Sequence, residues 1–240
     1  MKTMKTIKTI AGILLLSALV FLAYPADKTT TTAVVDISDV TDDFLLKPNL
    51  QDVLVLYSFD QSKWNGADFR FSDITQVSFN RVQHAKIEAE NEWRSNRFLR
   101  ENKIKQVQKK IADILTQAQQ ATAGQNNSSV YYPLAQELNR LAQIKADKKY
   151  MLIYSDLMEN SNLSFYKKDI LKKLNENPEE VRNILESNIK LQSLDGITIF
   201  FLFQPNNIKE DERYKIASKF FKDFFESKGA KVEITTSVSI

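Results

Sequence analysis

TTAVVDISDVTDD, residues 31–43, is the stretch that decides the predicted fold. Its β-branched run, residues 33–35, predicts a short buried strand. That strand leads directly into a cluster of carboxylate and hydroxyl side chains, residues 36–43. An open α/β sheet presents a ligand site in this way, at the carboxyl end of a strand. We therefore expect residues 36–43 to form part of a binding site.

Further apolar runs predict the rest of a six-stranded sheet. We expect buried strands over 53–59, 149–154 and 197–203, an antiparallel edge strand over 69–74, and a short last strand over 232–234. The Asn65-Gly66 pair is a strong turn signal, and it predicts a hairpin between the second and third of these strands.

Segments with helical spacing separate most of these strands. They cover residues 83–121, 132–144, 165–174, 178–186 and 209–227, the last with a wide phenylalanine face. Strands that alternate with helices predict a doubly wound, mostly parallel α/β sheet flanked by helices, with strand order 3-2-1-4-5-6 and a Rossmann-like plan. The first and fourth strands are neighbours in this order, so we expect Asp36 and Asp156 to open into one crevice.

Composition excludes several classes of protein. The 33 Lys and Arg against 30 Asp and Glu leave a net charge of +3, too small for the whole molecule to bind nucleic acid by charge alone. The absence of cysteine excludes disulfides, thiol catalysis and thiolate metal sites. With 43% hydrophobic residues and 5 each of Gly and Pro, the chain is expected to form one packed domain.

The first residues have the pattern of a leader. Lys2, Lys5 and Lys8 precede an uninterrupted apolar run, residues 10–24. This predicts a signal peptide or an amino-terminal membrane anchor over 1–26, with residues 7–26 just long enough to span a bilayer. We expect a linker over 27–32 and a domain over 33–240. Either interpretation exports the domain, to the periplasmic or cell-surface side, cleaved or held at the inner membrane.

The loop after the fourth strand repeats the pattern of the first. Ser155 and Asp156 follow residues 149–154, as Asp36 follows residues 33–35. Two carboxylates that meet in one crevice repel each other unless a cation lies between them. Hard oxygen ligands favour Mg²⁺, Mn²⁺ or Ca²⁺, and His84 is the only histidine of the chain. The alternative is that the two aspartates cap helices or bind loop amides.

Three motifs resemble the von Willebrand factor A (VWA) domain, particularly its bacterial members. They are Asp36-x-Ser38 after the first strand, Ser155-Asp156 after the fourth, and the segment Glu159-Asn160-Ser161. The metal-ion-dependent adhesion site (MIDAS) of that family uses D-x-S-x-S, a threonine in a second loop and an aspartate in a third. This chain departs from the motif at Val40, which takes the place of the second serine.

The resemblance implies a metal site and a function. The implied ligands of Mg²⁺, or of Mn²⁺ or Ca²⁺, are Asp36, Ser38 and Asp156, with Ser128 and Ser129 in place of the threonine. The implied function is a non-enzymatic, exported or membrane-anchored module that binds a protein through this site, with partner contacts from Asp39, Thr41 and Glu159.

Two other functions stay open at this stage. A metal-dependent hydrolase or phosphotransferase could use the same acids, although the chain has no glycine-rich phosphate loop and no nucleophile elbow. Residues 81–110 carry nine Lys and Arg against four Glu, which fits either a solvated helix face or a site for an anionic ligand such as nucleic acid. We expect Trp93 and Phe98, within this segment, to be core residues and expect no nucleic acid.

Overall fold

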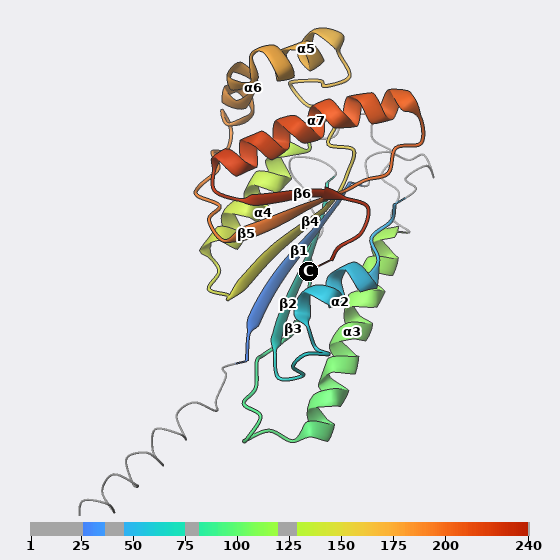
Figure 1. The fold of residues 1–240 in the computed structure, drawn as a ribbon, viewed down its shortest axis with the longest axis vertical. Coiled ribbons are helices and arrows are strands. Elements are labelled where there is room, and N and C mark those ends of the chain that lie inside the picture. The colour runs from blue at the N-terminus through green and yellow to red at the C-terminus, as the bar shows by residue number, and fades with distance from the viewer. Residues whose placement is uncertain (1–25, 37–45, 75–81, 120–128, 240) are drawn as a thin grey trace, which may run out of the picture.

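The centre of the molecule is one six-stranded sheet with the order β3-β2-β1-β4-β5-β6 (Figure 1). The computed structural model describes residues 26–36, 46–74, 82–119 and 129–239. The strands are β1 (Lys28–Asp36), β2 (Gly66–Ile74), β3 (Val82–Ile87), β4 (Lys148–Tyr154), β5 (Ile197–Leu202) and β6 (Lys231–Thr235). Every neighbouring pair is parallel except β2 and β3. The predicted mixed α/β class, strand order and mostly parallel sheet are confirmed.

Helices cover both faces of this sheet (Figure 1). They are α2 (Leu50–Tyr57), α3 (Arg97–Gln119), α4 (Tyr131–Gln143), α5 (Lys168–Glu176), α6 (Pro178–Leu185) and α7 (Ile208–Ser227). Successive residues of β1 point to opposite faces: Val34 packs in the cluster with α4 and α7, whereas Ala33 and Val35 pack in the cluster with α2 and α3. The result is a sheet between two helical layers, with a core on each side.

The parallel strands give the sheet two different edges, which we name for the strand ends that meet there. At the carboxyl edge the five parallel strands end, and at the amino edge they begin. β1 is buried on both faces from Thr29 to Asp36 and pairs with β2 on one side and β4 on the other. It therefore connects the two edges through the middle of the molecule.

The strand predicted over residues 53–59 is wrong, because this segment forms helix α2. Asn49 caps the helix, its side chain accepting from the Asp52 amide at 2.9 Å, and Ser58 ends it in the left-handed conformation. Val53, Leu56 and Tyr57 are fully buried at helical spacing. A short apolar run does not by itself distinguish a strand from a buried helix.

The predicted hairpin and the identity of the edge strand are also corrected. The segment predicted as the edge strand, 69–74, belongs to β2, which is parallel to β1. The antiparallel edge strand is β3, within the segment predicted to be helical. In β3, Ala85 and Ile87 are buried while His84 and Lys86 face solvent, so its side chains follow the two-residue period of a half-buried strand.

The predicted linker over residues 27–32 is likewise part of the sheet. Thr29, Thr30, Thr31 and Thr32 lie in β1, and each is at most 1% exposed. Threonine is β-branched and therefore favours a strand. Because it is also polar, a run of threonines in the sequence resembles a linker. The domain therefore begins about five residues earlier than predicted.

The predicted leader, residues 1–26, lies outside the described residues except for Ala26. In the part of the chain that the structure describes, no helix combines the length and apolarity needed to cross a membrane.

Arg100 holds the irregular backbone at the amino edge. Its side chain is fully buried and donates to three backbone carbonyls: Lys63 at 2.7 Å, Glu88 at 2.8 Å, and Asn65. These carbonyls belong to the loops that precede β2 and follow β3. One guanidinium at the start of α3 therefore fixes both loops.

We expect Arg100→Met to lower the free energy of unfolding by about 3 kcal/mol, because three buried carbonyls lose a charged donor. Arg97→Met is the matched control, since Arg97 is on the same helix but 75% exposed and paired with Glu101, and its loss should cost less than about 1 kcal/mol. Urea denaturation followed by circular dichroism measures both. Equal effects would contradict the role of Arg100 as the fixing residue.

Candidate functional site

The candidate site lies at the carboxyl edge, where β1 and β4 end side by side. Val35 is in register with Tyr154, so the next residues, Asp36 and Ser155, are neighbours. The Ser155 hydroxyl donates to Oδ2 of Asp36 at 2.9 Å, and both side chains are buried. The ends of the first and fourth strands of the predicted order therefore meet, as expected from the sequence.

Ser155 also fixes the loop that follows β4. Its Oγ accepts from the Leu157 amide at 2.9 Å, which closes a tight turn. Leu157 is fully buried and has a φ of +60°, a left-handed conformation that costs a leucine about 1 kcal/mol. One hydroxyl thus joins the Asp36 carboxylate to a strained loop and sets the position of both.

Asp156 faces a different part of this loop. Its Oδ1 accepts from the Met158 amide at 2.9 Å, and its Oδ2 lies 3.5 Å from the Tyr166 hydroxyl. Burial is the main cause that raises the pKa of Tyr214 in α7, and the negative charge of Asp156 adds to it. Asp156 is therefore close to that helix. These bonds match the alternative that Asp156 binds loop amides.

Only some of the predicted site residues are among those that the structure describes. Ser38, Ser128, Asp39 and Thr41 lie outside the described residues. Within the described ranges, no three acidic or histidine side chains gather in an arrangement that could hold a metal ion.

Glu159 binds the amino end of helix α4. Its side chain is fully buried, and its Oε2 accepts from the amides of Val130 at 2.9 Å and Tyr131 at 2.7 Å. Val130 provides no side-chain cap, so Glu159, 29 residues further along the chain, caps the helix instead. Glu159 therefore has a structural role at the start of α4, and its predicted contact with a partner stays a prediction.

Burial raises the pKa of Glu159 to about 7, and repulsion from the Asp36 carboxylate adds to this shift. Hydrogen bonds from Ser161 and from the Tyr131 and Val130 amides act in the opposite direction. Asp36 and Glu159 are thus a pair of acids that interact electrostatically at the carboxyl edge. A positive charge near them would favour the ionised form of both.

A small cavity of about 60 Å³ opens beside Glu159. Ser129 and Glu159 line it together with the ends of α4 and α6. A cavity of this size has room for a water molecule or an ion, and its lining includes a hydroxyl and a carboxylate. Ser129, predicted as a ligand in place of a threonine, is therefore brought together with Glu159.

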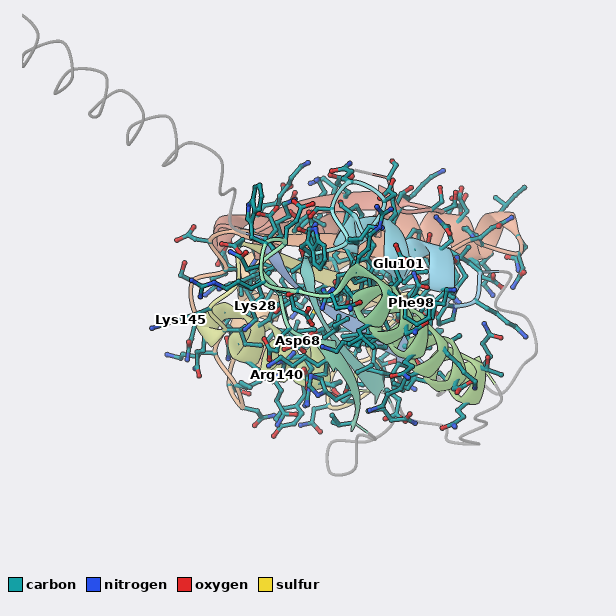
Figure 2. The ribbon with its side chains drawn as sticks, turned by 90° about the horizontal axis from the view of Figure 1, so that it is seen from below. Lys28, Asp68, Phe98, Glu101, Arg140 and Lys145 are labelled. Carbon is teal, nitrogen blue, oxygen red and sulfur yellow. The ribbon has the colours of Figure 1, made fainter. Side chains whose placement is uncertain are left out.

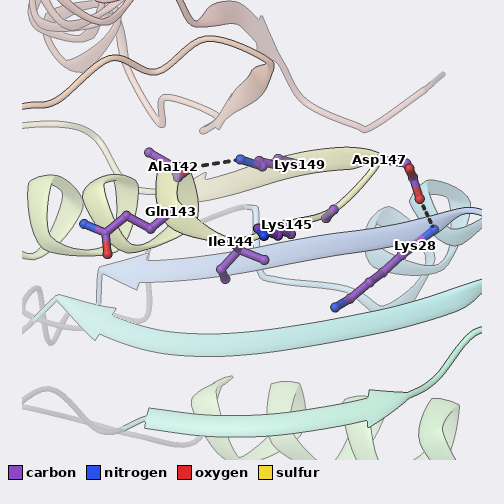
Figure 3. A pocket seen from close by; sticks show the side chains of 8 residues that line it. Lys28, Ala142, Gln143, Ile144, Lys145, Asp147 and Lys149 are labelled. Carbon is purple, nitrogen blue, oxygen red and sulfur yellow. Dashed lines mark hydrogen bonds between the residues drawn. The ribbon is translucent and has the colours of Figure 1, made fainter.

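A larger hollow, of about 570 Å³, lies at the opposite, amino edge (Figure 3). Lys28, Lys145 and Lys149 line it together with Asp147. Two of its polar groups have partners: Lys149 Nζ donates to the Ala142 carbonyl at 2.9 Å, and the Lys28 amide donates to Asp147 at 2.7 Å. This hollow is separate from the candidate site.

Ion pairs neutralise part of the basic segment 81–110 in the fold. Its cations pair with nearby carboxylates: Lys86 with Glu88, Arg97 with Glu101, Lys103 with Glu90 and Lys109 with Asp113. The prediction that Trp93 and Phe98 are core residues is wrong, because they are 78% and 71% exposed. The predicted helix begins only at Arg97, and the residues before it form β3 and a loop.

Comparisons with known proteins do not identify a family. No protein-family model and no curated protein matches the chain. Among solved structures, a point mutant of the PilB minor pilin from Streptococcus sanguinis matches with a TM-score of 0.48 and 12% identity, over 90% of this chain and 59% of that one. Proximal thread matrix protein 1 from the mussel byssus matches with a TM-score of 0.30 and 13% identity, over 86% and 47%. The chain thus spans less than two thirds of either protein, and we draw no functional conclusion from these likenesses.

Ser155→Ala should lower the free energy of unfolding by about 2 kcal/mol, because the buried Asp36 oxygen loses a donor and the Leu157 amide loses an acceptor. Ser193→Ala is a matched control: Ser193 makes the same pair of bonds, to the Asp195 carboxylate and amide, on an exposed surface. Its effect should be within about 0.5 kcal/mol of zero. Chemical denaturation compares the two, and a larger effect of the Ser193 change would contradict the central place of Ser155.

Glu159 gives the stability a defined pH dependence. Between its ordinary pKa of 4.5 and its folded value of about 7, the folded protein holds a proton that the unfolded chain has released. Raising the pH through this window should therefore lower the free energy of unfolding, by up to about 3 kcal/mol. Denaturation curves at several pH values should show this slope in the wild type and not in Glu159→Gln.

The control for this experiment is Glu212→Gln, which removes an exposed carboxylate from α7. Its curves should keep the wild-type slope. If Glu159→Gln also kept that slope, a different group would be the source of the pH dependence.

Proposed function

We propose that the protein is a VWA-like binding module, with the Rossmann-like plan of that domain, that recruits a protein partner through the carboxyl edge of β1 and β4. The observation that carries this proposal is the hydrogen bond between Ser155 and Asp36, which unites the two motif-bearing loops. The proposed function is binding, without catalysis.

The topology supports a site at this position. From β1 the chain goes to β2 and β3 on one side and returns to β4 on the other side of β1. The strand order thus changes direction between β1 and β4, and open α/β sheets bind ligands in the crevice at such a point. Asp36 and Ser155 are the first residues beyond the paired register there, and they belong to the motifs that resemble the VWA domain.

The side chains at this edge suit a hard divalent cation. Asp36, Ser129 and Glu159 offer carboxylate and hydroxyl oxygens, and the two acids repel each other. We propose Mg²⁺, Mn²⁺ or Ca²⁺, with Ser38, Ser128 and Asp156 completing the set of oxygen donors. A bound cation would supply a coordination position for a carboxylate of the partner, while Asp36 and Glu159 would hold its charge near the edge.

A binding role is favoured over catalysis by the position of the single histidine. His84 lies in the edge strand β3 and its Nε2 is 2.6 Å from Asp68, so it serves a strand-to-strand contact away from Asp36. The candidate site therefore gains no imidazole base.

We further propose that the domain is exported, because Lys2, Lys5 and Lys8 and the apolar run 10–24 have the pattern of a leader.

Isothermal titration of the purified protein with Mg²⁺ and with Mn²⁺ tests the cation. We expect saturable binding that Asp36→Asn weakens about tenfold or more, because a carboxylate in direct or close contact is lost. Asp60→Asn, in an exposed turn at the amino edge, should bind as the wild type does. No heat of binding, or equal binding by the Asp36 variant, would overturn the proposed cation site.

A further inference from the structure

Three large apolar side chains face solvent in the short segment 93–99, just before and at the start of α3. Trp93 is 78% exposed, Phe98 71% and Leu99 57%. We call these three residues the aromatic patch. Most phenylalanines of the chain lie in the core, so an exposed Trp-Phe-Leu group on an ordered surface calls for a binding explanation.

The backbone that carries the patch is firmly held. Arg100 bonds the flanking loops, and the Glu90 amide donates to the Trp64 carbonyl at 3.0 Å. Asn91 and Asn96 accept from the amides of Trp93 and Leu99, at 2.9 and 3.1 Å. The backbone that carries the patch is therefore held in place, which lowers the entropic cost of binding.

The patch is at the amino edge, where the chain enters the sheet. Ile87, the last residue of β3, pairs with Ala67. The amide of the neighbouring Gly66 donates a hydrogen bond to the Asp27 carbonyl at 2.8 Å. The loop from residue 88 thus starts beside the first residues of β1. Figure 1 shows β1 and α3 both beginning at the lower end of the molecule, and Figure 2, seen from that end, shows Phe98 and Lys28 on it.

The sequence limits how far this edge can be from the leader. The apolar run 10–24 ends at Tyr24, and β1 begins at Lys28. Four residue steps span at most about 14 Å even when fully extended. If the run 10–24 is in a bilayer, the amino edge must lie at the surface of that bilayer.

We propose that the aromatic patch rests in the headgroup region of the membrane that holds residues 7–26. The inference rests on the anchored form of the proposed exported module. Tryptophan, phenylalanine and leucine beside Arg94 and Arg97 are the residues that favour a membrane interface.

The charges around the patch predict the kind of lipid. Glu101 pairs with both Lys63 and Arg97, and Lys103 pairs with Glu90. Because Glu90 also contacts Arg100, each of these two carboxylates serves two cations, and the surface around the patch keeps a positive charge. Anionic lipid should therefore strengthen the contact. Insertion of the apolar side chains does not depend on this charge, so neutral phosphatidylcholine should suffice for binding.

Tryptophan fluorescence of the full chain in vesicles tests the proposal. Trp64→Phe leaves Trp93 as the only tryptophan of the chain. In vesicles of phosphatidylcholine with bromine on the acyl chains near the glycerol, we expect its emission to be quenched relative to unbrominated vesicles, and its maximum to shift to the blue. If Trp64→Phe disturbs folding, the difference in quenching between wild type and Trp93→Phe gives the same information.

The matched control moves the reporter to the other edge. Ile208 begins α7 at the carboxyl edge and is 79% exposed, so Ile208→Trp in a chain with Trp64→Phe and Trp93→Phe should not be quenched. Equal emission of the Trp93 reporter in both vesicles, or a chain that does not float with them, would overturn the proposal. Cation binding is measured separately, so that result would leave the carboxyl-edge site standing.

Discussion

The central constraint of this molecule is that β1 is buried on both faces and bonded on both sides. Its eight buried residues, Thr29–Asp36, can only be accommodated between two helical layers and two parallel neighbours. Because β2 and β4 run in the same direction, their ends meet those of β1. Ser155 then reaches Asp36, and Gly66 reaches Asp27. Both functional proposals depend on this strand, one at each of its ends.

Polar groups inside the fold decide which loops are fixed. Two buried charged groups show this: Glu159 accepts from two amides at the start of α4, and Arg100 donates to three carbonyls at the amino edge. Glu137, in α4, binds Arg70 through two bonds of 2.8 Å. A made hydrogen bond contributes only about 1 kcal/mol, but an orphaned buried partner costs about 1–3 kcal/mol. These groups therefore specify the positions of α4 and of the loops more than they add net stability.

The sequence predicted elements where the hydrophobic period is long or the flanks are clear, as in β4, β5 and α7. It failed over 53–59, where a mainly apolar run fits a strand as well as a helix and only the Asn49 cap distinguishes them. It failed again at β3, where a helix-favouring composition concealed a two-residue period. The meeting of the ends of β1 and β4 followed from topology and was predictable, whereas the hydrogen bond of Asp36 to Ser155 in place of a crevice shared with Asp156 was not. The cap by Glu159 was not, because its partner amides lie 28 and 29 residues away; the only signal was a helix that starts after Val130, a residue unable to cap it.

The two proposals need different surroundings at the two edges: the amino edge would contact a bilayer, and the carboxyl edge would face a partner protein. The length of β1 separates the two edges. Nine residues of strand span about 30 Å, so an amino edge on a bilayer would place Asp36 about that far from the lipid, facing outward. A site that recruits a protein needs such a position, since a crevice at the membrane surface would be closed to a folded partner. The strongly held loops at the amino edge and the acidic pair at the carboxyl edge are then two halves of one arrangement. In the proposed arrangement, the strand that begins beside the membrane would present the binding loops at its far end.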